Sequence, residues 1–222
     1  MLPSTLKFKV GFYPAITVTV AMLVFTAIVV LHQRNELLDS TADHVTRLSE
    51  VIAKSMRYAM LQNQPYYIDR IIHDVANQEN IDRVRILSKE GRITHSTYGP
   101  EIGEIVDRNA EACSRCHQNE KPLEQVPRSK RTWVFVNPEG RRMLGSMEVI
   151  RNEPSCYNAA CHQHSKTTAV LGVLDIVYSV DDIDRAMQAH GIFLAGLSVG
   201  FILIVSFGVS LFVHRLVYLP LR

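Results

Sequence analysis

Two long uncharged runs set the strictest limit on how this chain folds. Residues 10–31 and residues 191–213 contain no Asp, Glu, Lys or Arg. At a rise of 1.5 Å per residue, each run forms a helix of about 33 Å, which is long enough to cross the hydrocarbon core of a bilayer. A buried core helix is the other interpretation of an apolar run, but neither run has an amphipathic face. We therefore predict two transmembrane helices.

The charged residues predict the orientation of these helices. All 22 acidic residues lie between positions 32 and 190, whereas the two ends hold only basic residues, Lys7, Lys9, Arg215 and Arg222. Positive charge marks the cytoplasmic side of a membrane helix, so both termini are expected in the cytoplasm of a bacterial cell and the middle of the chain in the periplasm. The run 10–31 is too long for a signal peptide and has no A-x-A cleavage site, so it is expected to stay as an anchor in the inner membrane. The expected order is cytoplasmic residues 1–9, membrane helix 10–31, periplasmic domain 32–190, membrane helix 191–213 and cytoplasmic residues 214–222.

All four cysteines lie in two related motifs, CSRCH at residues 113–117 and CYNAACH at residues 156–162. The pattern C-x-x-C-H attaches a c-type haem, because two thiols at this spacing reach the two vinyl groups of the porphyrin and the histidine faces the iron. The second motif has four residues between its cysteines and resembles the longer attachment motifs of multihaem cytochromes. We therefore expect two covalent haem c groups, attached at Cys113, Cys116, Cys156 and Cys161, with His117 and His162 as proximal ligands. Attachment of haem on the exported side agrees with the predicted topology.

Two other uses of these cysteines remain open. The four thiols are an acceptable ligand set for a zinc ion, but a zinc site does not explain why a histidine follows the second cysteine of each motif. Disulfides suit an exported domain, although a bridge from Cys113 to Cys116 would close a very short loop.

The sixth ligand of each iron decides between electron transfer and binding of a gas. Met56 and Met60 lie four residues apart on one face of the predicted stalk helix, and His95 lies on the same strand face as Ile93. Ordinary core packing is the alternative role for the methionines. The distal candidates are Met56, Met60, His95 and His164, and the wider set also includes His44, His73, Met143 and Met147.

The region after the first membrane helix is predicted to remain helical, because it contains no Pro or Gly before Pro65. Apolar and small residues recur there at spacings of three and four, which makes a stripe on one helical face. The stripe consists of Leu38, Thr41, Val45, Leu48, Ile52, Ser55 and Ala59. It suits packing against the domain itself or against a second copy of the chain in a homodimer.

The rest of the periplasmic segment predicts a helix followed by an antiparallel sheet. The helix is expected over residues 65–78, with Pro65 in its first turn. Strands are expected over 81–87 and 92–97 around a hairpin, and over 132–136, 143–150 and 169–179. A last helix, with Ser179 as its N-cap and Asp182 completing a capping box, is expected to run into the second membrane helix.

This order of elements, together with the phrase IDRVRILSKEGRITHS, resembles the extracytoplasmic sensor domains called Cache or PAS-like. The resemblance covers residues 32–190 and implies an α+β fold, in which two transmembrane helices flank a domain with a long N-terminal helix and a central antiparallel sheet. It also implies that the loop-rich intervals 99–131 and 151–167, which contain the haem motifs, hold the ligand. The tail HRLVYLPLR, residues 214–222, resembles the start of a HAMP linker, which implies a receptor with a kinase, cyclase or methyl-accepting output domain.

Two functions fit these features. The first is a transmembrane signalling input module that senses redox state or a small gas through two haems. The second is a membrane-anchored dihaem cytochrome that passes electrons from quinol to a periplasmic partner. The expected partners are therefore the membrane, a second copy of the chain, and either an output domain or a redox partner. No catalytic motif is present, and the excess of acidic over basic residues in the exported segment argues against binding of nucleic acid.

Overall fold

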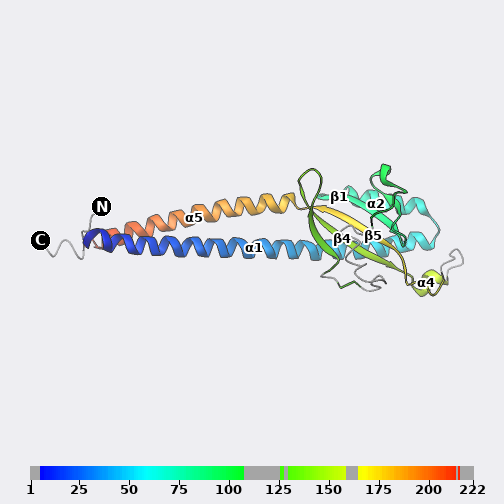
Figure 1. Cartoon of the computed structure of the whole chain (residues 1–222), viewed down its shortest axis with the longest axis horizontal. Helices are drawn as coiled ribbons and strands as arrows, with labels where there is room; N and C mark the ends of the chain where they lie inside the picture. Colours follow the sequence, from blue (N-terminus) through cyan, green and yellow to red (C-terminus); the bar gives the residue numbers. More distant parts are fainter. Residues whose placement is uncertain (1–5, 108–125, 128–129, 159–164, 214, 216–222) are drawn as a thin grey trace. The chain divides into compact units, whose positions relative to one another are not determined.

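The computed structural model describes residues 6–107, 126–127, 130–158, 165–213 and 215. The chain divides into two compact units (Figure 1). One unit combines residues 1–38 with residues 183–222, and the other consists of residues 39–182.

The first unit contains the two apolar runs as helices. The helix α1 spans Leu6–Leu61 and the helix α5 spans Asp181–Val213. Both helices are long and apolar enough to cross a membrane. Within this unit they lie side by side (Figure 1), and the hydroxyl groups of Thr26 and Ser198 are 2.8 Å apart. Large apolar side chains such as Leu23, Phe25 and Phe207 are exposed on them, which suits contact with lipid.

The second unit is built on a five-stranded antiparallel sheet with the strand order β2-β1-β5-β4-β3. Its strands are β1 (Ile81–Ser88), β2 (Ile93–Ser96), β3 (Thr132–Val136), β4 (Arg142–Arg151) and β5 (Val170–Ser179). Short helical segments complete it: α2 (Pro65–Ala76), the 3-10 turn η1 (Gly99–Glu101) and α4 (Pro154–Tyr157). The hairpin between β1 and β2 turns at Gly91, whose φ of 82° is a conformation that favours glycine.

The C-terminal half of α1 and the helix α2 pack on one face of this sheet. Buried side chains of α1, α2 and strands β1, β4 and β5 form one apolar cluster. The predicted stripe on α1 is thus mostly confirmed, and in this unit it packs against its own sheet. Ser55 is an exception, because it is exposed and its hydroxyl donates to the carbonyl of Val51. Ser49 is buried instead, with its hydroxyl 3.1 Å from that of Ser146 on β4.

The opposite face of the sheet carries a second apolar cluster and a group of charged side chains. The cluster consists of Val126, Trp133, Met147 and Val149. The unit therefore has the predicted α+β arrangement, with a long N-terminal helix packed on a central antiparallel sheet.

The predicted capping box at the start of α5 is wrong. The N–H of Ser179 donates to the carbonyl of Asn80 at 2.7 Å, because Ser179 is the last residue of β5. Its hydroxyl accepts the N–H of Asp181, two residues further on.

Candidate functional site

Most of the predicted haem-binding residues lie outside the described residues. They are Cys113, Cys116, His117, Cys161, His162 and His164. Cys156 is described: it is buried on α4 and has no disulfide partner among the described residues. The site is therefore built from Cys156 and from the segments that flank the two motifs.

The second motif belongs to the loop of residues 152–169, which joins β4 to β5. Asn152 closes this loop: its backbone N–H donates to Ala169 at 3.0 Å, and its side-chain amide donates to the carbonyls of Ser165 and Thr168 at 3.0 and 2.8 Å. Pro154 starts the single turn of α4. The N–H of Cys156 donates to the carbonyl of Glu153 at 2.7 Å. The loop thus holds Cys156 in a fixed turn beside the sheet.

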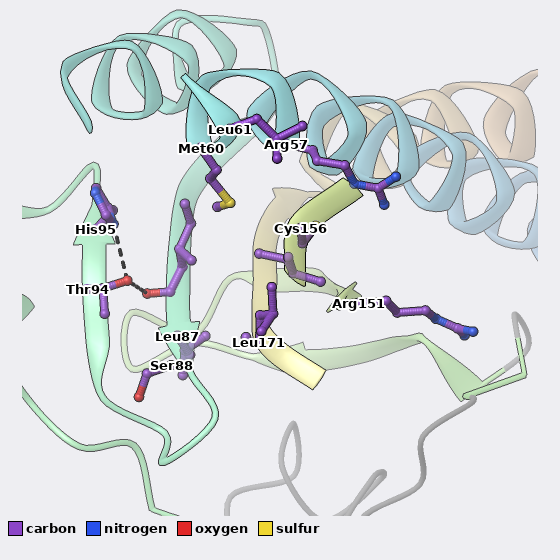
Figure 2. Close-up of a pocket in the computed structure, with 13 residues that line it drawn as sticks. Arg57, Met60, Leu61, Leu87, Ser88, Thr94, His95, Arg151, Cys156 and Leu171 are labelled. Atoms are coloured by element: carbon purple, nitrogen blue, oxygen red, sulfur yellow. Dashed lines mark hydrogen bonds between the residues drawn. The ribbon is translucent and has the colours of Figure 1, made fainter. Parts of the chain in front are cut away.

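Cys156 borders a cavity of about 200 Å³ between the sheet and the end of α1 (Figure 2). Met60 from α1 and His95 from β2 line the same cavity. Its remaining walls are mainly apolar, and the full lining is Arg57, Met60, Leu61, Ile86, Leu87, Ser88, Thr94, His95, Ile150, Arg151, Cys156, Leu171 and Gly172. Pockets for drug-sized ligands are about 300–1,000 Å³, so the cavity alone accommodates a smaller group than a whole porphyrin.

The imidazole of His95 is oriented by two neighbours. Its Nδ1 lies 3.1 Å from the hydroxyl of Thr94, and its Nε2 lies 3.9 Å from a carboxylate oxygen of Asp69 on α2. The cavity brings together a thiol, which can attach to a vinyl group of a haem, and a thioether and an imidazole, which can ligate the haem iron. Cys156, Met60 and His95 therefore supply the kinds of side chain that a haem attached at Cys156 needs, and the porphyrin would extend beyond the cavity itself.

The distal candidates that the structure describes lie in different surroundings. Met56 is fully buried in the apolar core and does not line the cavity, although it lies one turn from Met60. Met143 and Met147 are buried in the sheet, and His44 and His73 are exposed. In the part of the chain that the structure describes, no group of three His, Cys, Asp or Glu side chains could hold a metal ion.

The end of the segment that carries the first motif is fixed by Arg131, just before β3. The guanidinium Nε donates to the carbonyl of Val126 at 2.9 Å. Its Nη1 lies 2.6 Å from the carboxylate of Glu148 on β4 and 3.1 Å from that of Glu50 on α1. Burial raises the pKa of Glu148, and the nearby Glu50 carboxylate adds to this, whereas Arg131 opposes it.

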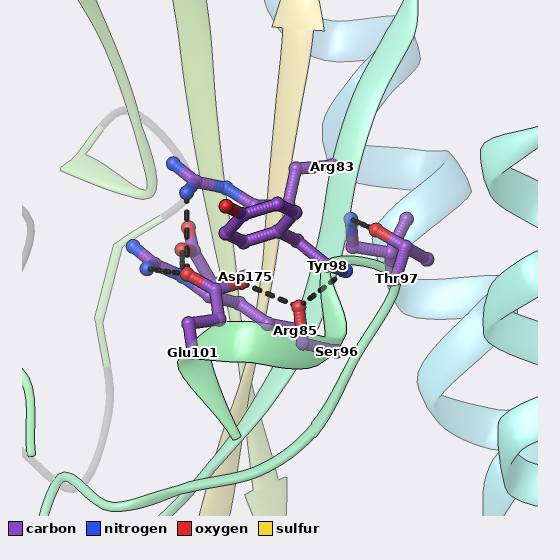
Figure 3. Close-up of polar contacts among 8 residues, drawn as sticks. Arg83, Arg85, Ser96, Thr97, Tyr98, Glu101 and Asp175 are labelled. Carbon is purple, nitrogen blue, oxygen red and sulfur yellow. Dashed lines mark hydrogen bonds and ion pairs between the residues drawn. The ribbon is translucent and has the colours of Figure 1, made fainter. Parts of the chain in front are cut away.

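A second charged group crosses the other face of the sheet (Figure 3). Arg85 on β1 is paired with Asp175 on β5 at 2.5 Å and with Glu101 at 3.4 Å, and Arg83 reaches Glu101 at 3.2 Å. The hydroxyl of Ser96 also donates to Glu101. Burial acts to lower the pKa of Arg85, but the carboxylates of Asp175 and Glu101 outweigh it, so the net pKa is raised.

Sequence reasoning did not identify these two charged groups. The alternation of β1 places Arg83 and Arg85 on one face, which was the available signal. Their partners depend on the register of strands that are distant in sequence.

No protein-family model matches the sequence, and no curated protein matches it. Among solved structures, the chain is similar to the sensor domain of the histidine kinase DctB of V. cholerae, with 12% sequence identity and a TM-score of 0.48. The match covers 75% of this chain and 59% of that one. A similarity at this level concerns the course of the backbone and assigns no function.

Proposed function

We propose that this chain is the input module of a transmembrane signalling protein, and that it senses redox state or a small gas through two covalently attached c-type haems. The observation that carries the proposal is the cavity where Cys156 of the second motif meets Met60. Met60 belongs to α1, the same continuous helix that contains the first apolar run. A group attached at Cys156 would thus lie beside a helix that leads into the membrane.

Each part of the proposed site has a defined role. Cys156 and Cys161 would attach the second haem, with His162 as its proximal ligand and Met60 or His95 on the distal side. Cys113, Cys116 and His117 would hold the first haem in the same way. When bound, haem supplies an iron that is oxidised or reduced by one electron, or that binds a diatomic gas at an open coordination position. The apolar residues around Met60 would exclude water from this iron.

The connections of the sheet favour signalling over electron transfer. The helix α1 packs on the sheet, and α5 begins at Asp181, directly after β5 ends at Ser179. Both helices with an apolar run are therefore joined closely to the sensing unit. An electron carrier needs only an anchor, for which one such helix is sufficient.

The same proposal places the sheet unit in the periplasm and both termini in the cytoplasm of a bacterial cell, following the distribution of charge. It includes a second copy of the chain as a partner in the membrane. It also includes a cytoplasmic output domain joined through the HAMP-like residues 214–222.

Spectroscopy and mass analysis of the full chain test the haems. The chain is produced in cells that mature c-type cytochromes, and wild type is compared with Cys113→Ala/Cys116→Ala and Cys156→Ala/Cys161→Ala. Wild type should carry two covalent haems and each double variant one. Absence of covalent haem from the wild-type polypeptide would refute the proposal.

Hydrogen exchange separates the sensor from the carrier. The backbone exchange of residues 41–61 of α1 is measured in the oxidised, reduced and carbon monoxide-bound protein. A sensor should show a difference between states in these residues, because its signal passes through α1. Two haems with identical exchange in every state would favour the electron carrier.

Substitution of the methionines tests the distal ligand with a matched control. Met60→Leu should change the haem spectrum, because the thioether faces the cavity. Met56→Leu should not, because Met56 lies in the core and a Leu for Met exchange nearly conserves volume. The same spectrum in both variants would assign the distal position to another side chain, for which His95→Ala is the next test.

A further inference from the structure

Residues that flank the two cysteine motifs make ion pairs with one edge of α1. Arg131, at the end of the first segment, pairs with Glu50, and Glu153, at the start of the second loop, pairs with Arg57. Glu50 and Arg57 are seven residues apart, which is close to two full turns of an α-helix. They therefore lie on the same edge of α1, about 10 Å apart along its axis.

The pair on the second loop is joined directly to Cys156. The Nη1 of Arg57 lies 2.5 Å from Oε2 of Glu153, and the two side chains are 28% and 42% exposed. The backbone carbonyl of the same Glu153 accepts the N–H groups of Cys156 and Tyr157 at 2.7 and 3.2 Å. Glu153 thus contacts α1 with its side chain and holds the turn of Cys156 with its backbone.

The pair on the first segment has reversed charge, and its base also contacts the sheet, because Nη1 of Arg131 lies 2.6 Å from the carboxylate of Glu148 on β4. Arg131 is 14% exposed and Glu50 is 22% exposed. Arg131 contacts Glu50 through Nη1 and holds the carbonyl of Val126 through Nε. The acid is on α1 in this pair, whereas the base is on α1 in the other. An exchange of partners between the two pairs would bring like charges together, Arg131 with Arg57 and Glu153 with Glu50.

We propose that Glu50 and Arg57 are positioning residues through which the two haem-bearing segments act on α1. The inference rests on the proposed function, since it names the contacts by which a change at either haem would reach the helix. Movement of the second loop would shift Glu153 and with it Arg57, and movement of the first would shift Arg131 and with it Glu50. Because both ion pairs contact the same edge of α1, movements of the two segments would have combined effects on this helix.

The test uses the full chain with both haems and measures hydrogen exchange in residues 41–61 in the oxidised and reduced states. Arg57→Gln and Glu50→Gln should each reduce the redox-dependent difference by about half, because two contacts act in parallel and independent effects add. The double variant Arg57→Gln/Glu50→Gln should lose the redox-dependent difference in exchange. Arg70→Gln is the control, because the ion pair of Arg70 with Asp74, at 3.9 Å, lies within α2 and both side chains are well exposed.

Charge reversal distinguishes a specific contact from general damage. Arg57→Glu alone should abolish the contribution of the second loop, and Arg57→Glu/Glu153→Arg should restore it, with two haems present in every variant. A redox-dependent difference that survives in Arg57→Gln/Glu50→Gln would overturn the inference and leave the proposed function intact. No difference in the wild type would refute the signalling function itself.

Discussion

Replacing Asp175 by Asn should destabilise the sheet unit while preserving the shape of the side chain. Asp175 is paired with Arg85 at 2.5 Å across β5 and β1, and its side chain is only 5% exposed. The substitution removes the negative charge and leaves Arg85 with Glu101 at 3.4 Å. Arg85 stays protonated, because an arginine guanidinium keeps its charge in proteins whether or not a carboxylate is beside it.

The expected cost lies between two limits. Leaving a buried charge without any partner costs about 3–5 kcal/mol, and a hydrogen bond to a charged group contributes about 1.5–3 kcal/mol. Because Glu101 still contacts Arg85, we expect a loss of about 2 kcal/mol in the free energy of unfolding. With a urea dependence of about 2 kcal/mol per molar, the unfolding midpoint should fall by about 1 M.

Fluorescence of Trp133 provides the assay. Trp133 is the single tryptophan of the chain and is buried on β3, so its emission reports on the sheet unit and not on the apolar helices. The control is Asp82→Asn, since Asp82 is 36% exposed and lies 3.5 Å from Arg141. A surface pair contributes at most about 1 kcal/mol, so the control should shift the midpoint by less than about 0.5 M. An equal shift in the two variants would refute the argument.

Three further outcomes are expected. Gly172→Ala should destabilise the sheet by about 1–3 kcal/mol, because the new Cβ would lie 2.5 Å from the backbone oxygen of Leu87, and thermal unfolding measures this loss. The pKa of Glu148 is raised in the folded protein. As the pH rises from the ordinary carboxyl range through this raised pKa, ionisation of Glu148 therefore destabilises the folded state more and more. The melting temperature of Glu148→Gln minus that of wild type should therefore be larger at pH 7 than at pH 4. Thr26→Val should weaken the contact of Thr26 with Ser198 by about 0.6 kcal/mol, as measured by the stability of the two apolar helices in detergent.

Local patterns were sufficient for most of the secondary structure. The strand over residues 132–136 has the predicted bounds, and the helix that begins at Pro65 ends two residues earlier than predicted. Both elements depend on signals within a few residues, namely β-branched and aromatic side chains for the strand and a proline at the first helical position. The prediction of a capping box was wrong because the N–H of Ser179 donates to the carbonyl of Asn80, a residue almost a hundred positions away in the sequence.

The sequence by itself determined the two apolar helices, the α+β order of elements and the two Cys-His motifs, because each depends on composition or spacing along the chain. Only the tertiary structure decided which methionine reaches the cavity. Met56 and Met60 share a helical face, but the sheet covers the first and leaves the second beside Cys156. The tertiary structure likewise decided that Glu50 and Arg57 contact the two loops. Ion pairs between distant segments depend on strand register and loop course, and these are fixed by packing of the whole unit.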